Sequence, residues 1–246
     1  MSPETLEQIA GALTVSAAAF LGGVTGFGYA LLATPMLLLI GFPLPFVVTL
    51  NLSLALVTRI SIAYRFRADV LPRRVTALVL GSVPGLWLGA QVLTRVDEAA
   101  IKVAAGALVM AVAVLLLRSL TAPPPKPLPG AATAAGFAGG FLGSTTSLNG
   151  VAPVLLLARD KAAPRSFIAD LALYFVASNA IALCLLALTG ALAGDALFPA
   201  FAIWLPGSVA CNWLGASVGP RLPERAFRRL TLAIVFVTGA ITALTA

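Results

Sequence analysis

The sequence predicts an all-α polytopic membrane protein of two inverted repeats, each made of a broken or re-entrant helical hairpin and three transmembrane helices. Hydrophobic residues make up 60% of its 246 residues, and charged residues only 10%, far below the roughly 25% of a soluble domain. Long apolar runs follow one another along the chain, and its two halves carry similar motifs in the same order. So few charges cannot cover a folded body in water, whereas apolar helices can face lipid directly.

Six apolar runs are long enough to cross about 30 Å of hydrocarbon at 1.5 Å per residue. They span residues 46–64, 75–93, 99–117, 166–188, 197–218 and 230–246. Two further apolar regions, 6–42 and 131–158, are interrupted by glycines and small polar residues. Glycine weakens a helix, and Ser, Thr and Asn offer the backbone other hydrogen bonds. We therefore expect each region to fold as two half-helices joined by an irregular segment.

A proline-rich linker at 122–130 divides the chain into a first repeat, 1–121, and a second repeat, 131–246. Leu88–Glu98 lines up with Leu214–Glu224 at a constant offset of 126, with Leu, Gly, Ala, Val, Arg and Glu recurring in place. One hairpin and three crossings give each repeat an odd number of crossings. The second repeat is therefore expected to be inverted, as in many secondary transporters.

The net charge of +7 comes from Lys and Arg in short clusters between the apolar runs. Such clusters indicate cytoplasmic loops rather than a nucleic-acid surface. Two basic loops, 65–74 and 159–165, are predicted to be cytoplasmic, so that 131–158 enters and leaves from the cytoplasm and 6–42 from outside. The sequence contains no histidine, which removes the commonest general base and transition-metal ligand. We expect neither an enzyme nor a bound metal or cofactor.

The two hairpins are the predicted substrate site. A helix that begins within the membrane exposes free N–H groups and a positive dipole end, which attract an anion. Thr34 with Pro35 has the form of an N-cap and N1 pair, and Asn149 or Gly150 is expected to cap the helix before Pro153. The hairpin candidates for substrate binding are Thr25, Gly26, Gly28, Thr34, Ser144, Thr145, Thr146, Ser147 and Asn149. Alternatively, the polar groups satisfy irregular backbone and the glycines only pack helices.

Four polar residues in the full crossings are further candidates. Asn51 and Asn179 either face the central site or bond between helices. Arg59 either reaches the nearby cytoplasmic surface or draws an anionic substrate inward. Asp170 either pairs with Arg165 or a neighbouring cation, or acts as a coupling group that carries protons. Cys184 and Cys211 are expected to serve packing.

Several of these motifs resemble one known family. They are Gly22–Gly28 with Pro35–Leu37, Gly136–Gly143 with Pro153–Leu155, and Leu-Gly-Ala at 88–90 and 214–216. The chain resembles the sulfite exporter TauE/SafE family, also called the TSUP family of membrane transporters, over nearly its whole length. The resemblance implies movement of sulfite, sulfonates such as sulfoacetate, or other small sulfur-containing or carboxylate anions across a prokaryotic inner membrane.

The expected function is therefore a secondary transporter, an exporter, of small sulfur-containing or organic anions. An anion channel and a proton-coupled carboxylate or sulfonate carrier of the same fold remain alternatives. The expected partners are a small anionic substrate and the lipid bilayer, with no nucleic acid, and a homodimer is left open. An inside-negative membrane potential is sufficient to drive anions outward, so no other energy source is required.

Overall fold

A computed structural model describes residues 3–95, 100, 128–192 and 197–221, and these residues form helices and short connections without strands. Five of the helices are long and apolar enough to cross a membrane, namely α1, α3, α4, α8 and α9. The elements are α1 (Pro3–Thr25), α2 (Gly28–Ile40), α3 (Leu44–Arg65), η1 (Arg67–Asp69), α4 (Pro72–Arg95), α6 (Ala131–Thr146), α7 (Val151–Arg159), α8 (Pro164–Leu188), α9 (Leu197–Val218) and η2 (Gly219–Arg221). The predicted class, an all-α polytopic membrane protein, is confirmed.

The predicted crossings at 46–64, 75–93, 166–188 and 197–218 correspond to α3, α4, α8 and α9. Those at 99–117 and 230–246 lie outside the described residues. The inverted relation of the two repeats stays a prediction. Cys184 is exposed on α8, so the expected packing role is wrong for that residue.

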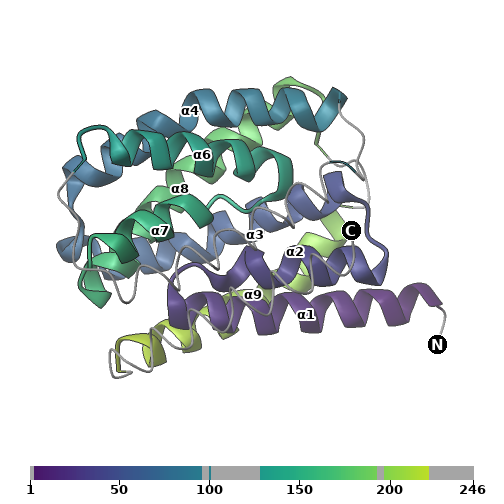
Figure 1. The fold of residues 1–246 in the computed structure, drawn as a ribbon. Coiled ribbons are helices and arrows are strands. Elements are labelled where there is room, and N and C mark those ends of the chain that lie inside the picture. Colours follow the sequence, from purple (N-terminus) through teal and green to yellow (C-terminus); the bar gives the residue numbers. More distant parts are fainter. Residues whose placement is uncertain (1–2, 96–99, 101–127, 193–196, 222–246) are drawn as a thin grey trace.

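The helices of the two halves exchange partners. In Figure 1, α4 and α6 lie along one edge of the molecule and α1 and α9 along the opposite edge, with α3 and α8 between them. The first helix of each half thus packs on the last described span of the other half: α1 on α9, and α6 on α4. This arrangement places the two helix breaks, which follow α1 and α6, in the interior beside α3 and α8.

Glycines allow close contact within the two helix pairs at the edges of the molecule, α4 with α6 and α1 with α9. On α4 and α6, a Cβ added at Gly81, Gly85, Gly136 or Gly140 would overlap a backbone carbonyl of the other helix. On the α1–α9 pair, the same holds for Gly23 against Asn212 and for Gly215 against Phe20. Small residues let helix backbones approach in lipid, where packing rather than the hydrophobic effect drives association. These glycines therefore serve helix packing, whereas the candidates Gly26 and Gly28 lie at the first helix break.

The irregular segments are shorter than the sequence predicted. The first break is only residues 26–27, and the second is residues 147–150. Gly26 ends α1 with φ +85°, and its N–H donates to the Gly22 carbonyl at 2.8 Å. Ser147 ends α6 in the same left-handed region, with φ 60°. A single residue in the left-handed region is enough to end a helix. The glycines before Gly26 and Ser147 therefore stay within α1 and α6.

Two predictions about the hairpins are wrong. The pair Thr34–Pro35 does not begin a helix, because α2 already begins at Gly28 and contains Pro35; transmembrane helices tolerate an internal proline. The first hairpin is also not two half-helices, since α1 alone is long enough to cross the membrane. In the second hairpin Gly150 occupies the cap position of α7, without a side-chain cap.

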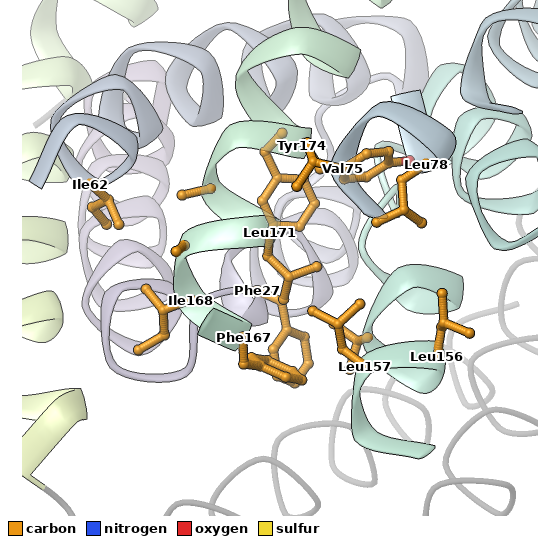
Figure 2. Close-up of a cluster of buried hydrophobic side chains, with 14 of the residues drawn as sticks. Phe27, Ile62, Val75, Leu78, Leu156, Leu157, Phe167, Ile168, Leu171 and Tyr174 are labelled. Carbon is orange, nitrogen blue, oxygen red and sulfur yellow. The ribbon is translucent and has the colours of Figure 1, made fainter. Parts of the chain in front are cut away.

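A buried apolar cluster supports the first break. Figure 2 shows Phe27 lying beside Phe167 of α8 and Leu157 of α7. The rings of Phe27 and Phe167 meet edge to face, with 6.2 Å between their centroids. Gly26 faces Ile168, whose Cγ1 would lie 3.3 Å from an added Cβ. Packing against α8 therefore fixes the position of the chain at the break and of the residues that follow it.

Candidate functional site

A small cavity lies between the two helix breaks. Its walls come from the first break and the start of α2, from α3, from the second break and from α8. They are formed by Phe27, Tyr29, Ala30, Asn51, Leu52, Ala55, Arg59, Ser147, Asn149, Phe175 and Asn179. The free space at its centre is about that of one water molecule. Both halves of the chain therefore contribute to one narrow, partly polar cavity.

Asn51 on α3 connects the first hairpin to the second. The Tyr29 hydroxyl donates to Asn51 Oδ1 at 3.0 Å, and Asn51 Nδ2 donates to Thr34 Oγ1 at 3.1 Å and to Ser147 Oγ at 3.3 Å. The Thr34 and Ser147 hydroxyls share a further hydrogen bond of 2.8 Å. All four residues are buried. Thr34 is not a helix cap, but its hydroxyl holds α2 against the second break.

Asn149 in the second break bonds to α8. Its Nδ2 donates to Asn179 Oδ1 at 2.5 Å and to Ser178 Oγ at 3.2 Å. Asn179 is fully buried, and its Nδ2 has no hydrogen-bond partner in the described part of the chain. A buried N–H group without a partner costs roughly 1–3 kcal/mol. This amide is therefore a donor available to a molecule in the cavity.

Among the described residues that line the cavity, Arg59 is the one with a cationic side chain. Only 2% of the residue is exposed, so it does not reach the surface as the alternative interpretation required. Its Nη1 donates to the Gly22 carbonyl at 3.0 Å, and its guanidinium lies 5.6 Å from the centre of the Phe175 ring. No carboxylate of the described residues forms an ion pair with it. A buried, unpaired cation is costly, and an anion in the cavity would relieve that cost.

Gly22 has a specific role beside this cation. A Cβ at Gly22 would lie 2.9 Å from Arg59 Nη2 and 2.7 Å from the Tyr29 Cβ. Any larger residue would therefore displace the guanidinium or the tyrosine. The glycine-rich end of α1 makes room for Arg59 and supplies the carbonyl that orients it.

Three threonine candidates of the hairpins do not line the cavity. Thr25 spans the first break: its hydroxyl donates to the Leu21 carbonyl at 2.8 Å and accepts the Gly28 N–H at 3.1 Å. Thr145 and Thr146 donate to carbonyls of their own helix, Phe141 and Leu142, at 2.9 Å each. For these three threonines the observed contacts are those of the backbone-satisfying alternative.

Three further candidates, Ser144, Gly26 and Gly28, also lie outside the lining. Ser144 is buried in α6 on the side that faces α4, where an added Cβ at Gly89 would lie 3.1 Å from its Cβ. Gly26 and Gly28 flank Phe27 and form the first break. Their contribution is to place Phe27 and Tyr29 in the cavity wall.

Asp170 is engaged elsewhere. Its carboxylate is fully buried and forms an ion pair with Arg74, whose Nε donates to Oδ2 at 2.7 Å. Oδ1 accepts the Leu71 N–H, also at 2.7 Å. The neighbouring cation is thus Arg74 rather than Arg165. Asp170 joins α8 to the start of α4 and does not line the cavity.

Three aromatic residues of the cavity wall were not among the predicted site residues: Phe27, Tyr29 and Phe175. Phe27 and Tyr29 follow Gly26 within three residues. The left-handed turn at that glycine directs the following residues toward the interior. The sequence feature that could have identified Phe27 and Tyr29 is their position directly after a glycine break. No such feature distinguishes Phe175 within its apolar run.

Five apolar helices of membrane-spanning length define the chain as a polytopic membrane protein, and a cavity lined by a buried cation lies between its two helix breaks. The family model of the sulfite exporter TauE/SafE matches residues 11–242, nearly the whole chain. The chain belongs to this family of membrane transporters. Neither the curated proteins nor the solved structures gave a significant match.

Proposed function

We propose that this protein is a secondary transporter that exports small sulfur-containing or organic anions, such as sulfite or sulfoacetate, through the cavity at Arg59. One observation carries the proposal: a buried guanidinium lines the cavity, and no carboxylate in the described part of the chain pairs with it. The Asn179 Nδ2 group of the same cavity is a second donor, and it has no hydrogen-bond partner among the described residues. A charged donor and an amide donor suit an oxyanion, which accepts hydrogen bonds only.

The cavity wall favours a small anion over water. Phe27 and Phe175 supply apolar surface, and they lower the local dielectric around the guanidinium. An anion that enters exchanges its hydration for Arg59 and the amides. The present space fits about one water molecule, so binding of a larger anion requires the walls to move apart. The Thr34–Ser147 hydrogen bond joins the two halves at this point and must adjust in that movement.

We further propose that the membrane potential drives export. Moving one charge through 100 mV yields about 2.3 kcal/mol. Asp170, the acidic candidate for proton coupling, is held by Arg74 and the Leu71 N–H away from the cavity. That arrangement supports a structural carboxylate rather than a proton carrier. An anion channel or a proton-coupled carrier is the outcome to be distinguished from this proposal.

The test compares the wild type with Arg59→Gln, Arg59→Lys and the matched control Arg73→Gln. Arg73 is exposed and lies outside the cavity, and its loss removes the same charge. Purified proteins are screened by thermal shift against sulfite, sulfate, sulfoacetate, taurine and acetate, because a ligand of the folded state raises the unfolding temperature.

A charge-assisted hydrogen bond contributes about 1.5–3 kcal/mol, or roughly ten- to a hundredfold in affinity. Arg59→Gln should lose that much affinity for the anion that stabilises the wild type. Arg59→Lys should retain part of it, and Arg73→Gln all of it. Equal affinity in Arg59→Gln and the wild type would place the substrate elsewhere. Saturable flux in proteoliposomes indicates a carrier, and ohmic current a channel.

A further inference from the structure

The ends of two membrane-spanning helices are joined at the molecular surface. α3 ends at Arg65 and α9 at Val218, and Arg65 Nη1 donates to Ser217 Oγ at 3.2 Å. Both helices are apolar and long enough to cross a membrane. Their joined ends therefore lie near the boundary between hydrocarbon and water. We call this surface the α3–α9 patch, and it consists of Tyr64, Arg65, Arg67, Trp213, Ser217 and Arg221.

The arginines of the α3–α9 patch are exposed and carry uncompensated charge. Arg67 lies over the Tyr64 ring, 4.3 Å from its centre, and its Nη1 donates to the Tyr64 carbonyl at 3.0 Å. Arg65 is held by Ser217, and Arg221 follows in η2. Asp69 is close in sequence, yet within the described ranges neither Arg65 nor Arg67 forms an ion pair with any carboxylate. Contacts with Ser217 and Tyr64 therefore hold Arg65 and Arg67 of the patch in position.

Two aromatic side chains of the patch are largely exposed, Tyr64 by 70% and Trp213 by 56%. Tyrosine and tryptophan favour the headgroup level of a membrane, where one end of the ring is apolar and the other wet. Ser217 lies one turn beyond Trp213 and donates to its carbonyl at 3.0 Å. Below these residues, α9 also exposes Leu214 and Val209. Cations thus stand directly above an apolar helix surface.

We infer that the α3–α9 patch binds an anionic phospholipid, with the phosphate at Arg65 and Arg67 and the acyl chains along the exposed face of α9. Guanidinium groups suit a phosphate because they donate several hydrogen bonds in a fixed plane. A soluble anion would have no use for the apolar face beneath the cations. The occupant lies at the end of α3, the helix that also carries Asn51 and Arg59 to the cavity. The inference does not depend on which anion is transported.

The test titrates the full-length protein in detergent with phosphatidylglycerol, phosphatidylcholine or inorganic phosphate. It measures the unfolding temperature and, by native mass spectrometry, the retained lipid. The variant is Arg65→Gln with Arg67→Gln. Its matched control is Arg73→Gln with Arg165→Gln, which removes equal charge from exposed arginines outside the patch.

Phosphatidylglycerol should stabilise the wild type and the control, and the patch variant should bind it roughly thirtyfold more weakly. Ser217→Ala, which frees Arg65 without changing charge, should bind it more weakly than the wild type and serves if the double variant does not fold. If the patch variant and the control bind phosphatidylglycerol equally well, the binding reflects general electrostatic attraction between the lipid and the basic protein. That result would overturn the inference. Stabilisation by phosphatidylcholine or by inorganic phosphate to the same extent would also overturn it.

Discussion

The two helix breaks differ in length and in what they bring to the cavity. The first consists of Gly26 and Phe27 and contributes aromatic surface through Phe27 and through Tyr29, the second residue of α2. The second runs from Ser147 to Gly150 and contributes a hydroxyl and an amide. The cation comes from neither break but from α3. Halves with similar sequence motifs thus supply different chemistry, and one asymmetric site results.

The largest expected difference between the two hairpins is the side of the membrane from which each one enters. Cysteine labelling tests it, because each position reacts from one side or the other. Cysteines at Leu128 and Lys161, in a background lacking Cys184 and Cys211, should react with an impermeant reagent from the same side. A cysteine at Leu6 should react from the opposite side. All three positions are exposed. Labelling of Leu128 and Lys161 from opposite sides would break the inverted-repeat prediction.

The next largest effect is expected in the second break. Asn149→Leu should weaken substrate binding roughly ten- to a hundredfold, because the amide that orients Asn179 and lines the cavity is lost. Thr145→Val with Thr146→Val should change affinity by about twofold at most, since both hydroxyls bond their own helix. Isothermal titration with the anion identified by thermal shift measures both. A larger loss of substrate affinity in the threonine variant would indicate that the substrate binds at α6.

A substitution in the first break should change the folding stability of the protein rather than its substrate specificity. Gly26→Ala places a side chain at φ +85°, which costs about 1–2 kcal/mol of folding stability. Gly41→Ala is the matched control for backbone strain, because Gly41 has φ +112° and nothing within 4 Å of an added Cβ. Ile168 lies close to Gly26, so Gly26→Ala should lower the unfolding temperature further than the control. Equal losses would show that backbone strain alone accounts for the effect.

The smallest effect on transport is expected at Asp170. Asp170→Asn leaves Arg74 with a neutral partner, so the folded protein should be less stable, by up to about 3–5 kcal/mol. Its efflux should nevertheless keep most of its rate and its response to an imposed inside-negative potential in proteoliposomes. Loss of that efflux in folded protein, or dependence on a pH gradient alone, favours the proton-coupled alternative.

The sequence was sufficient for the general architecture because composition and apolar length leave few alternatives in lipid. The breaks were found at the right places, since Gly26 and the polar run ending in Asn149 cannot continue a helix easily. The start of α2 was misplaced because Pro35 looks like a helix beginning, whereas Gly26 had already ended the preceding helix. The positive φ of Gly26 thus decided where α2 begins.

Of the residues that line the candidate cavity, the sequence singled out only polar ones. Asn51, Arg59 and Asn179 stand out in apolar runs because burying such groups needs a reason. Phe27 and Phe175 do not stand out, since aromatic residues in an apolar run are ordinary. Whether Thr34 or Thr146 reaches the cavity depends on a helix rotation that weakly amphipathic helices do not reveal. Tertiary packing, not local pattern, decided which hydroxyls are shared between the halves.

The exchange of partner helices also sets an order of events during synthesis. The α4–α6 pair can close as soon as α6 has entered the membrane. α1 emerges first, yet the helix that fills its glycine face, α9, is among the last described elements to be made. Contacts between distant parts of a chain form slowly, because a long loop must close first. Of the described helices, α1 must therefore wait longest in the bilayer, with its glycine face uncovered until α9 has been made.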